Sequence, residues 1–203
     1  MATYGAKYAR FAPFSGAEPE AKEKKMPAYG DVLDLGPLNQ TSDNLSFTEA
    51  SSYGDNARKI YIRKFQSGTV TAVSVDVSAE SLGKIYGCDV GEDGSMAHGG
   101  ADGAPYGGYG FFVNRIDEAG NEYFQPIFYP KVKGGPNGST TYDTRGENIT
   151  IALDTIQFAV SEASCGKYKI EGPRFKAEQE AMEWIDNVFA GKAEIPGLSP
   201  SEE

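Results

Sequence analysis

Two aromatic segments that lie between glycine-rich stretches dominate the middle of the chain, within residues 94–160. Residues 109–116 and 122–133, both rich in aromatic side chains, flank a turn at 117–121, which predicts a β-hairpin. Pro126 and Pro130 share one parity, so both missing N–H donors fall on the same edge of the second strand. The second strand is therefore expected at a sheet margin or with a bulge at the prolines, in a chain built mainly of strands.

A long strand is expected after the hairpin, over residues 147–160, and its apolar positions change face. The first apolar set is Ile149, Ile151 and Leu153, whereas the second is Ile156, Phe158 and Val160. An element with a period of two must bulge or bend where its buried face changes, which predicts a bend near Asp154. Alternatively, one half packs in the domain's own core and the other half against a neighbouring subunit.

The other elements have recognisable boundaries. Residues 3–14, 31–39, 59–65, 69–77 and 168–170 are predicted strands, with Val73, Val75 and Val77 facing inward. Ser78 as an N-cap and Gly87 as a stop predict a short helix over 79–86. A second, amphipathic helix is predicted from Pro173 to Ala190, before Gly191, with one apolar stripe formed by Ala177, Ala181, Trp184, Ile185 and Val188.

The predicted fold class is mainly β, sandwich or barrel-like, with one short helix and one C-terminal amphipathic helix. Residues 1–191 are expected to form a single domain, and residues 192–203 a flexible tail. Within the domain, residues 41–58 are polar and nearly free of aliphatic side chains, which predicts a long loop that is mobile in the monomer. Long loops of this kind are usually functional or disordered.

The charge balance limits the classes of partner. A net charge of −10 disfavours proteins that grip nucleic acid phosphates or an anionic membrane surface. Cys88 and Cys165 are expected to be reduced structural thiols, because a secreted disulfide scaffold of this type normally uses more cysteines. Without an N-terminal signal-like run or a membrane-spanning run, the chain is expected to be made and kept in a cytoplasm.

No residue pattern points to catalysis. His98 is the only histidine and lies in a glycine-rich loop, which favours a solvated side chain over a catalytic role. Residues 89–102 form an acidic loop whose carboxylates could gather around calcium, although a solvated loop is preferred because the EF-hand spacing is absent. These carboxylates are Asp89, Glu92, Asp93 and Asp102. We expect a non-enzymatic protein without cofactor or metal; a hydrolase with paired carboxylates has no motif in its support.

Several segments, in order, resemble the major tail proteins of long-tailed phages and prophages of Gram-positive bacteria. They are MATYGAKYARFAPF at the start, GTVTAVSVDVSAESLGKIYG, APYGGYGFF and TTYDTRGENITI. The resemblance runs from residue 1 to about residue 160, and the closing helix with its tryptophan is also similar. Each segment alone is weakly specific, whereas the combination in this order is specific.

The resemblance implies a tail tube subunit whose β domains assemble into rings, hexameric in the family. These rings stack into a hollow tube through which DNA passes without specific binding. In the family a long loop bridges adjacent rings, and the matching segment here is 41–58. Its expected contact residues are Leu45, Ser46, Phe47, Thr48, Tyr53 and Asp55. Expected subunit-interface residues are Tyr4, Tyr8, Tyr106, Tyr109 and Phe158.

The resemblance further implies copies of this chain and other tail proteins as partners: the tape measure, distal tail and terminator proteins. The location would be the virion tail, assembled in the host bacterial cytoplasm. Two alternatives stay open. One is another tail or neck component on the same fold, and the other is a carbohydrate-binding β-sandwich that exposes Tyr106, Tyr109 and Tyr123.

Overall fold

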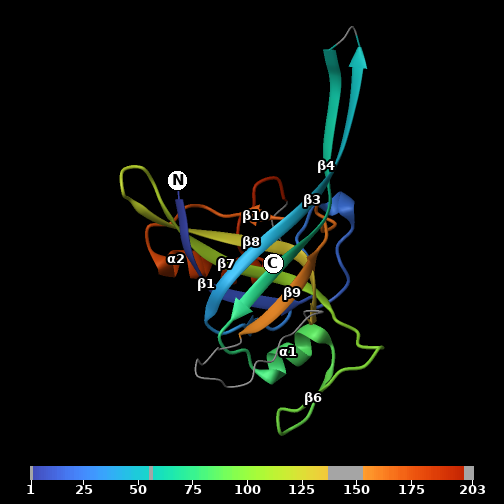
Figure 1. Ribbon diagram of the computed structural model, residues 1–203, viewed down its shortest axis with the longest axis vertical. Coiled ribbons are helices and arrows are strands. Elements are labelled where there is room, and N and C mark those ends of the chain that lie inside the picture. The colour runs from blue at the N-terminus through green and yellow to red at the C-terminus, as the bar shows by residue number, and fades with distance from the viewer. Residues whose placement is uncertain (1, 55–56, 137–152, 199–203) are drawn as a thin grey trace, which may run out of the picture.

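The computed structural model describes residues 2–54, 57–136 and 153–198, and it shows a mainly β protein (Figure 1). The described strands of the main sheet are antiparallel and follow the order β2-β1-β7-β8-β9-β4-β3, with β10 beside β8. Their bounds are β1 Ala2–Pro13, β2 Leu33–Asp34, β3 Leu38–Gly54, β4 Ala57–Ser74, β7 Tyr106–Ile116, β8 Glu122–Pro136, β9 Asp154–Val160 and β10 Ile170–Glu171.

The remaining described elements are small. A two-stranded ribbon is formed by β5 (Asp89–Val90) and β6 (Met96–Ala97), and Ala21–Glu23 forms a short 3-10 turn η1. Helix α1 spans Ala79–Tyr86 and helix α2 spans Glu178–Phe189. The predicted fold class, mainly β with a short helix and a C-terminal helix, is confirmed.

The main sheet curls, so that its last strand, β3, comes close to β1. Its inner face is packed with aromatic rings: the Phe158 ring centroid lies 4.8 Å from that of Tyr109 and 5.6 Å from that of Phe11. All three side chains are fully buried. Helix α2 packs on the other face against β7 and β8, where Ile185 and Val188 join Phe112 and Phe128 in a second buried cluster. The chain therefore has a barrel-like interior and a separate helix-covered face.

The predicted helix boundaries are right for α1 and partly wrong for α2. Ser78 Oγ accepts a hydrogen bond from Ser81 N (3.2 Å), and Gly87 ends α1 in the left-handed region at φ 68°. Helix α2 begins at Glu178 rather than at Pro173. The chain before it is extended, because Phe175 exchanges two backbone hydrogen bonds of 2.9 Å with Phe124 of β8.

Strand β4 corrects the prediction for residues 59–65 and 69–77. Residues 59–65 and 69–74 form one continuous strand, and its buried face is Val70, Ala72 and Ser74 rather than Val73. Val75, just after the strand, is 54% exposed, whereas Val77 is 6% exposed and therefore faces inward as predicted. The aromatic rings of the neighbouring strands already fill the interior, so that β4 contributes small side chains to it and turns Val73 outward.

The proline-containing strand β8 lies inside the sheet, between β7 and β9, so the predicted margin position is wrong. The alternative, a bulge, is confirmed. Tyr109 pairs with Tyr129 and Gly107 pairs with Val132, which leaves two residues of β8, Pro130 among them, opposite one residue of β7. The Pro130 carbonyl accepts a hydrogen bond from the Tyr29 hydroxyl at 2.9 Å.

In β9 the predicted alternation is confirmed for the second half of the segment. Ile156, Phe158 and Val160 are buried, whereas Gln157 and Ala159 are exposed. Most of the first half, including Ile149 and Ile151, lies outside the described residues, so the bend near Asp154 stays a prediction.

The Phe158→Ala substitution is expected to lower the free energy of unfolding by about 3–5 kcal/mol, because it empties the centre of the aromatic core. The matched control is Tyr4→Ala at a position that is 43% exposed, with an expected loss below about 1 kcal/mol. Urea titration followed by circular dichroism measures both values. Equal losses in the two variants would contradict this account of the core.

Candidate assembly surface

The segment predicted as a long loop, residues 41–58, is instead most of a β-hairpin. Strand β3 pairs with β4 from Leu38 opposite Ser74 to Gly54 opposite Ala57. Polar residues occupy both faces of residues 41–54, so no apolar alternation marks this strand in the sequence, although its threonines and aromatics favour extended backbone. The prediction of an irregular segment is therefore wrong.

The outer half of this hairpin projects from the body of the molecule (Figure 1). Strand β9 pairs with β4 only between Gly68 and Ser74, so that within the described residues the ribbon beyond Gly68 has no third strand. A two-stranded ribbon in water is marginally stable by itself, and its outer edges carry unpaired backbone groups. Such a segment gains stability when another chain covers it.

Three aromatic rings anchor the root of the hairpin to the body. Phe65 stacks on Tyr168 with ring centroids 4.2 Å apart, and Phe47 packs edge-on against both at about 6 Å. The Arg63 guanidinium lies 4.1 Å above the Phe47 ring and forms an ion pair with Glu49 at 3.3 Å. These contacts hold the direction in which the hairpin leaves the body.

Beyond the root, large apolar side chains are exposed on β4. Ile60 is 56% exposed and Ile62 is 49% exposed, and in the register they lie opposite Ser52 and Ala50 of β3. Because side chains alternate along a strand, Ile60 and Ile62 lie on one face of the ribbon, beside these two small side chains. We call this surface, formed by Ile60, Ile62, Ala50 and Ser52, the isoleucine face. Two adjacent exposed isoleucines make this face a candidate interaction site.

The predicted contact residues of this segment are distributed unevenly. Leu45 is half-buried against the main core, and Phe47 belongs to the root, whereas Ser46 and Thr48 are exposed. Tyr53 belongs to β3, but its side chain and the whole of Asp55 lie outside the described residues. The prediction missed the isoleucine face; its signal was the Ile-Tyr-Ile run between Lys59 and Arg63, read only as an ordinary alternating strand.

The predicted subunit-interface residues do not form one surface. Tyr109 and Phe158 are fully buried in the core, which corrects their assignment. Tyr8 is half-buried and its hydroxyl hydrogen-bonds to Asp186 at 3.0 Å. Tyr4 and Tyr106 are exposed, but they lie at opposite ends of the β1–β7 pair.

The aromatic residues named for carbohydrate binding also remain apart. Tyr109 is fully buried in the core. Tyr106 pairs with Lys133, whereas Tyr123 pairs with Arg115 at the other end of the β7–β8 hairpin. These three side chains therefore do not make a joint aromatic platform.

The acidic loop forms its own local contacts. Asp93 accepts hydrogen bonds from the backbone and side chain of Ser95, and Asp102 accepts from the Gly99 N–H at 3.0 Å. His98 Nδ1 lies 3.9 Å from an Asp102 oxygen. Among the described residues, no group of three or more His, Cys, Asp or Glu side chains has an arrangement suited to a metal ion.

Two further observations concern the thiols and the helices. Cys88 and Cys165 are both free, and the Cys165 thiol lies 3.9 Å from the Met26 sulfur. Within the described part of the chain, neither α1 nor α2 has the length and apolar character that crossing a membrane requires.

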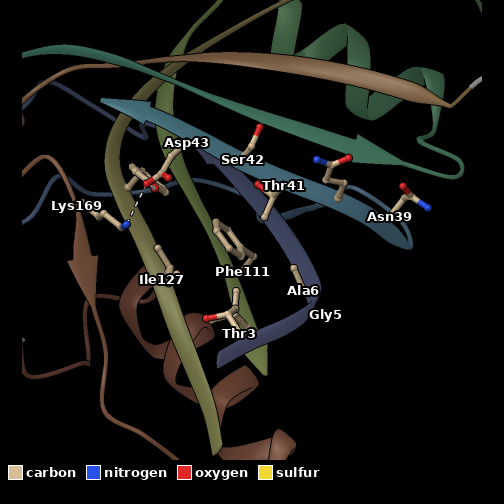
Figure 2. A pocket seen from close by; sticks show the side chains of 13 residues that line it. Thr3, Gly5, Ala6, Asn39, Thr41, Ser42, Asp43, Phe111, Ile127 and Lys169 are labelled. Carbon is tan, nitrogen blue, oxygen red and sulfur yellow. Dashed lines mark hydrogen bonds and ion pairs between the residues drawn. The ribbon is translucent and has the colours of Figure 1, made fainter. Parts of the chain in front are cut away.

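A groove of about 310 Å³ lies where β3 comes close to β1 (Figure 2). We call it the seam groove. Its walls are Thr3, Gly5 and Ala6 of β1 and residues 39–43 of β3, and its floor contains Phe111, Val113 and Ile127. One end holds a charged cluster, in which Asp43 Oδ2 accepts from the Tyr129 hydroxyl at 2.7 Å and from Lys169 Nζ at 3.0 Å.

The charge state of Asp43 follows from its partners. Partial burial alone would raise the pKa of Asp43, but the hydrogen bonds from Tyr129 and Lys169 favour the carboxylate more strongly and hold the pKa below its usual value. Burial and the same carboxylate raise the pKa of Tyr129 well above its usual range. At neutral pH the Tyr129 hydroxyl is therefore protonated and donates its hydrogen bond to the ionised Asp43 carboxylate.

Comparison with known proteins leaves the family open: no protein-family model matches the chain, and no curated protein matches it.

The Asp43→Asn substitution is expected to destabilise the protein at neutral pH and to have less effect in acid. A carboxylate whose folded pKa is depressed stabilises the fold above its unfolded pKa of about 3.9, and this contribution is lost as the pH falls through the folded value. The free energy of unfolding, measured from pH 7 to pH 3, should therefore fall more steeply in wild type than in the variant. The control is Asp31→Asn, at an exposed position. Parallel curves for wild type and the Asp43 variant would contradict the assignment.

Proposed function

We propose that this chain is a structural protein, the major tube subunit of a long bacteriophage tail, which assembles into stacked rings around a DNA-conducting lumen. The observation that carries the proposal is the projecting β3–β4 hairpin with its exposed isoleucine face. A subunit whose product is its own assembly needs a segment that extends beyond its own core to reach a neighbour. The resemblance of four segments to tail tube proteins supports the same proposal.

The unpaired backbone edges of the hairpin add to this support. Within the described residues, β3 has β4 as its only strand neighbour, and the outer part of β4 has only β3. Natural proteins usually blunt or cover such edges, because they are templates for pairing with another chain. Here the edge is long and next to exposed isoleucines, which favours pairing with copies of the same chain.

The double substitution of Ile60 and Ile62 by Thr tests the proposal. Threonine keeps the β-branched shape and strand preference but removes apolar surface from the contact, at about 0.8 kcal/mol per buried methylene-sized group. Self-association should weaken at least about tenfold in sedimentation velocity, and negative-stain images should lose rings or tubes. The matched control is Val32→Thr, at an apolar position that is 43% exposed on the body, and it should assemble as wild type does.

Wild-type protein that stays monomeric at every concentration, and is also not incorporated into tails in infected cells, would falsify the proposed function. Tubes that form equally well from the double variant would leave a structural role intact, but would remove the hairpin from the contact.

The protein is further expected to bind duplex DNA weakly, because the lumen must let DNA slide. With a net charge of −10, few phosphates can be neutralised, and phosphate contacts weaken steeply as salt rises. Gel-shift titration in about 0.15 M salt should give a dissociation constant weaker than about 1 µM. Tighter binding would contradict a lumen through which DNA passes.

A further inference from the structure

The seam groove is bounded by strand edges that lack partners. At its closed end, β2 pairs with β1 at Arg10 and Phe11, and Leu35 N donates to the Ala9 carbonyl at 3.2 Å. Beyond that point the described residues show no backbone ladder between β1 and β3, although the two strands remain close. The curled sheet is therefore a barrel that is closed at one end of this seam and open at the other.

Two irregular positions coincide with the open part of the seam. Gly5 and Tyr8 have positive φ angles of 66° and 61°, and the β1–β7 register shifts at both places. Bulges bend a strand and interrupt its ladder, and Tyr8 carries a conformation that is costly for a bulky residue. The contact of Tyr8 with Asp186 of α2 holds this geometry. The open seam is thus built into β1.

The chemistry of the groove defines what would fill it. Within the part of the chain that the structure describes, the outer edge of β3 at residues 39–43 has no strand partner, and an extended segment would satisfy its backbone donors and acceptors by adding a strand. The floor of Phe111, Val113 and Ile127 is apolar, so that the added strand needs apolar side chains at alternate positions. The outer rim carries both signs of charge, because Thr3 pairs with Arg115, which precedes Asp117 and Glu118 of the β7–β8 turn in the chain.

One segment of this chain has these properties. Residues 59–64 of β4 are extended and exposed, place Ile60 and Ile62 at alternate positions, and have an edge without a strand partner among the described residues. Lys59, Arg63 and Lys64 flank the isoleucines, a basic group in an acidic protein. The hairpin extends away from the body, so this segment reaches a seam groove only on another copy (Figure 1).

We propose that the seam groove of one copy receives residues 59–64 of a second copy, which add to the edge of β3 with Ile60 and Ile62 in the groove. This proposal rests on the proposed self-assembly and assigns the surface that receives the hairpin. The contact joins two different surfaces, hairpin and groove, so each copy keeps one unused hairpin and one unused groove. Such a heterologous contact propagates from copy to copy instead of ending at a dimer.

A mixing experiment with full-length variants tests the proposal. The hairpin variant carries Ile60→Thr and Ile62→Thr, and the groove variant carries Ala6→Lys, which places a long charged side chain over the apolar floor. Thr3→Lys at the exposed rim serves as a second groove variant if Ala6→Lys fails to fold, with folding judged by the cooperativity of thermal unfolding. Asn44→Lys is the control for added charge, because its side chain lies on the opposite face of β3 from Asp43.

Sedimentation velocity should show that the hairpin variant and the groove variant are each monomeric, and that Asn44→Lys assembles as wild type does. An equimolar mixture of the first two should form a 1:1 dimer and nothing larger, because only one intact hairpin and one intact groove remain to combine. The dissociation constant of this mixed dimer should be at least about tenfold lower than that of the hairpin variant with itself.

Each other result has a distinct meaning. If both groove variants assemble as wild type does while the hairpin variant is monomeric, the groove is not the receiving surface and the proposed function stands. If the two monomeric variants form no dimer on mixing, hairpin and groove do not meet and the proposal is overturned. If wild type neither assembles at any concentration nor enters tails in infected cells, the proposed function fails and this proposal with it. If the hairpin variant loses only affinity for duplex DNA, residues 59–64 contact nucleic acid and the proposal is likewise overturned.

Discussion

Two buried tyrosine hydroxyls have their hydrogen-bond partners on β3, which couples the register of this strand to the aromatic core. Tyr109 and Tyr129 are buried in the aromatic core, and a buried hydroxyl without a hydrogen-bond partner costs free energy. Both partners are supplied by β3: Thr41 Oγ1 lies 3.5 Å from the Tyr109 hydroxyl, and Asp43 accepts from Tyr129. A shift of β3 by one residue would turn both partners away from the core. The same two contacts therefore position the root of the hairpin and the open edge of the seam groove.

The hairpin beyond this point depends on different physics. Its outer half has no core of its own, and the ordering cost of its backbone is offset by cross-strand pairing and by the Phe47, Phe65 and Tyr168 cluster at its root. Local stability should fall from root to tip, as is typical of segments with few buried contacts. A partner surface that covers Ile60 and Ile62 would contribute what the monomer lacks. Rigidity at the root and adaptability at the tip suit an element that must reach a neighbour.

The sequence predicted those elements whose signals are local or are set by burial. Ser78 and Gly87 delimit α1 through capping chemistry that needs no tertiary context, and the alternation of Ile156, Phe158 and Val160 reports one buried face. The same rule failed for β4, because alternation reveals two faces but not which one is buried when the interior is already filled by aromatic rings. It failed for residues 41–54 because this solvent-exposed strand is polar on both faces and so lacks the alternation of apolar and polar residues that predicts a strand.

The candidate surfaces were harder to predict for a related reason. The isoleucine face looks like a core strand in the sequence, since only the tertiary structure shows that Ile60 and Ile62 are not covered by any of the described residues. Tyr109 and Phe158 look like interface aromatics, since only the curled sheet places them inside. The seam groove has no sequence signal beyond Gly5, because it arises from two bulges in β1 and from the return of β3, and the positive φ of Tyr8 is invisible in a residue type that rarely adopts it.

The charge distribution decides how such a contact would respond to salt. A body with a net charge of −10 repels other copies of itself, but this repulsion acts across distances greater than the screening length of about 8 Å at physiological ionic strength. The basic residues Lys59, Arg63 and Lys64 around Ile60 and Ile62 lower the local negative charge where the hairpin would meet another copy. Moderate salt weakens the long-range repulsion between the bodies. The apolar component is not weakened by this screening, so an assembly of this kind is compatible with physiological salt although its subunits carry the same charge.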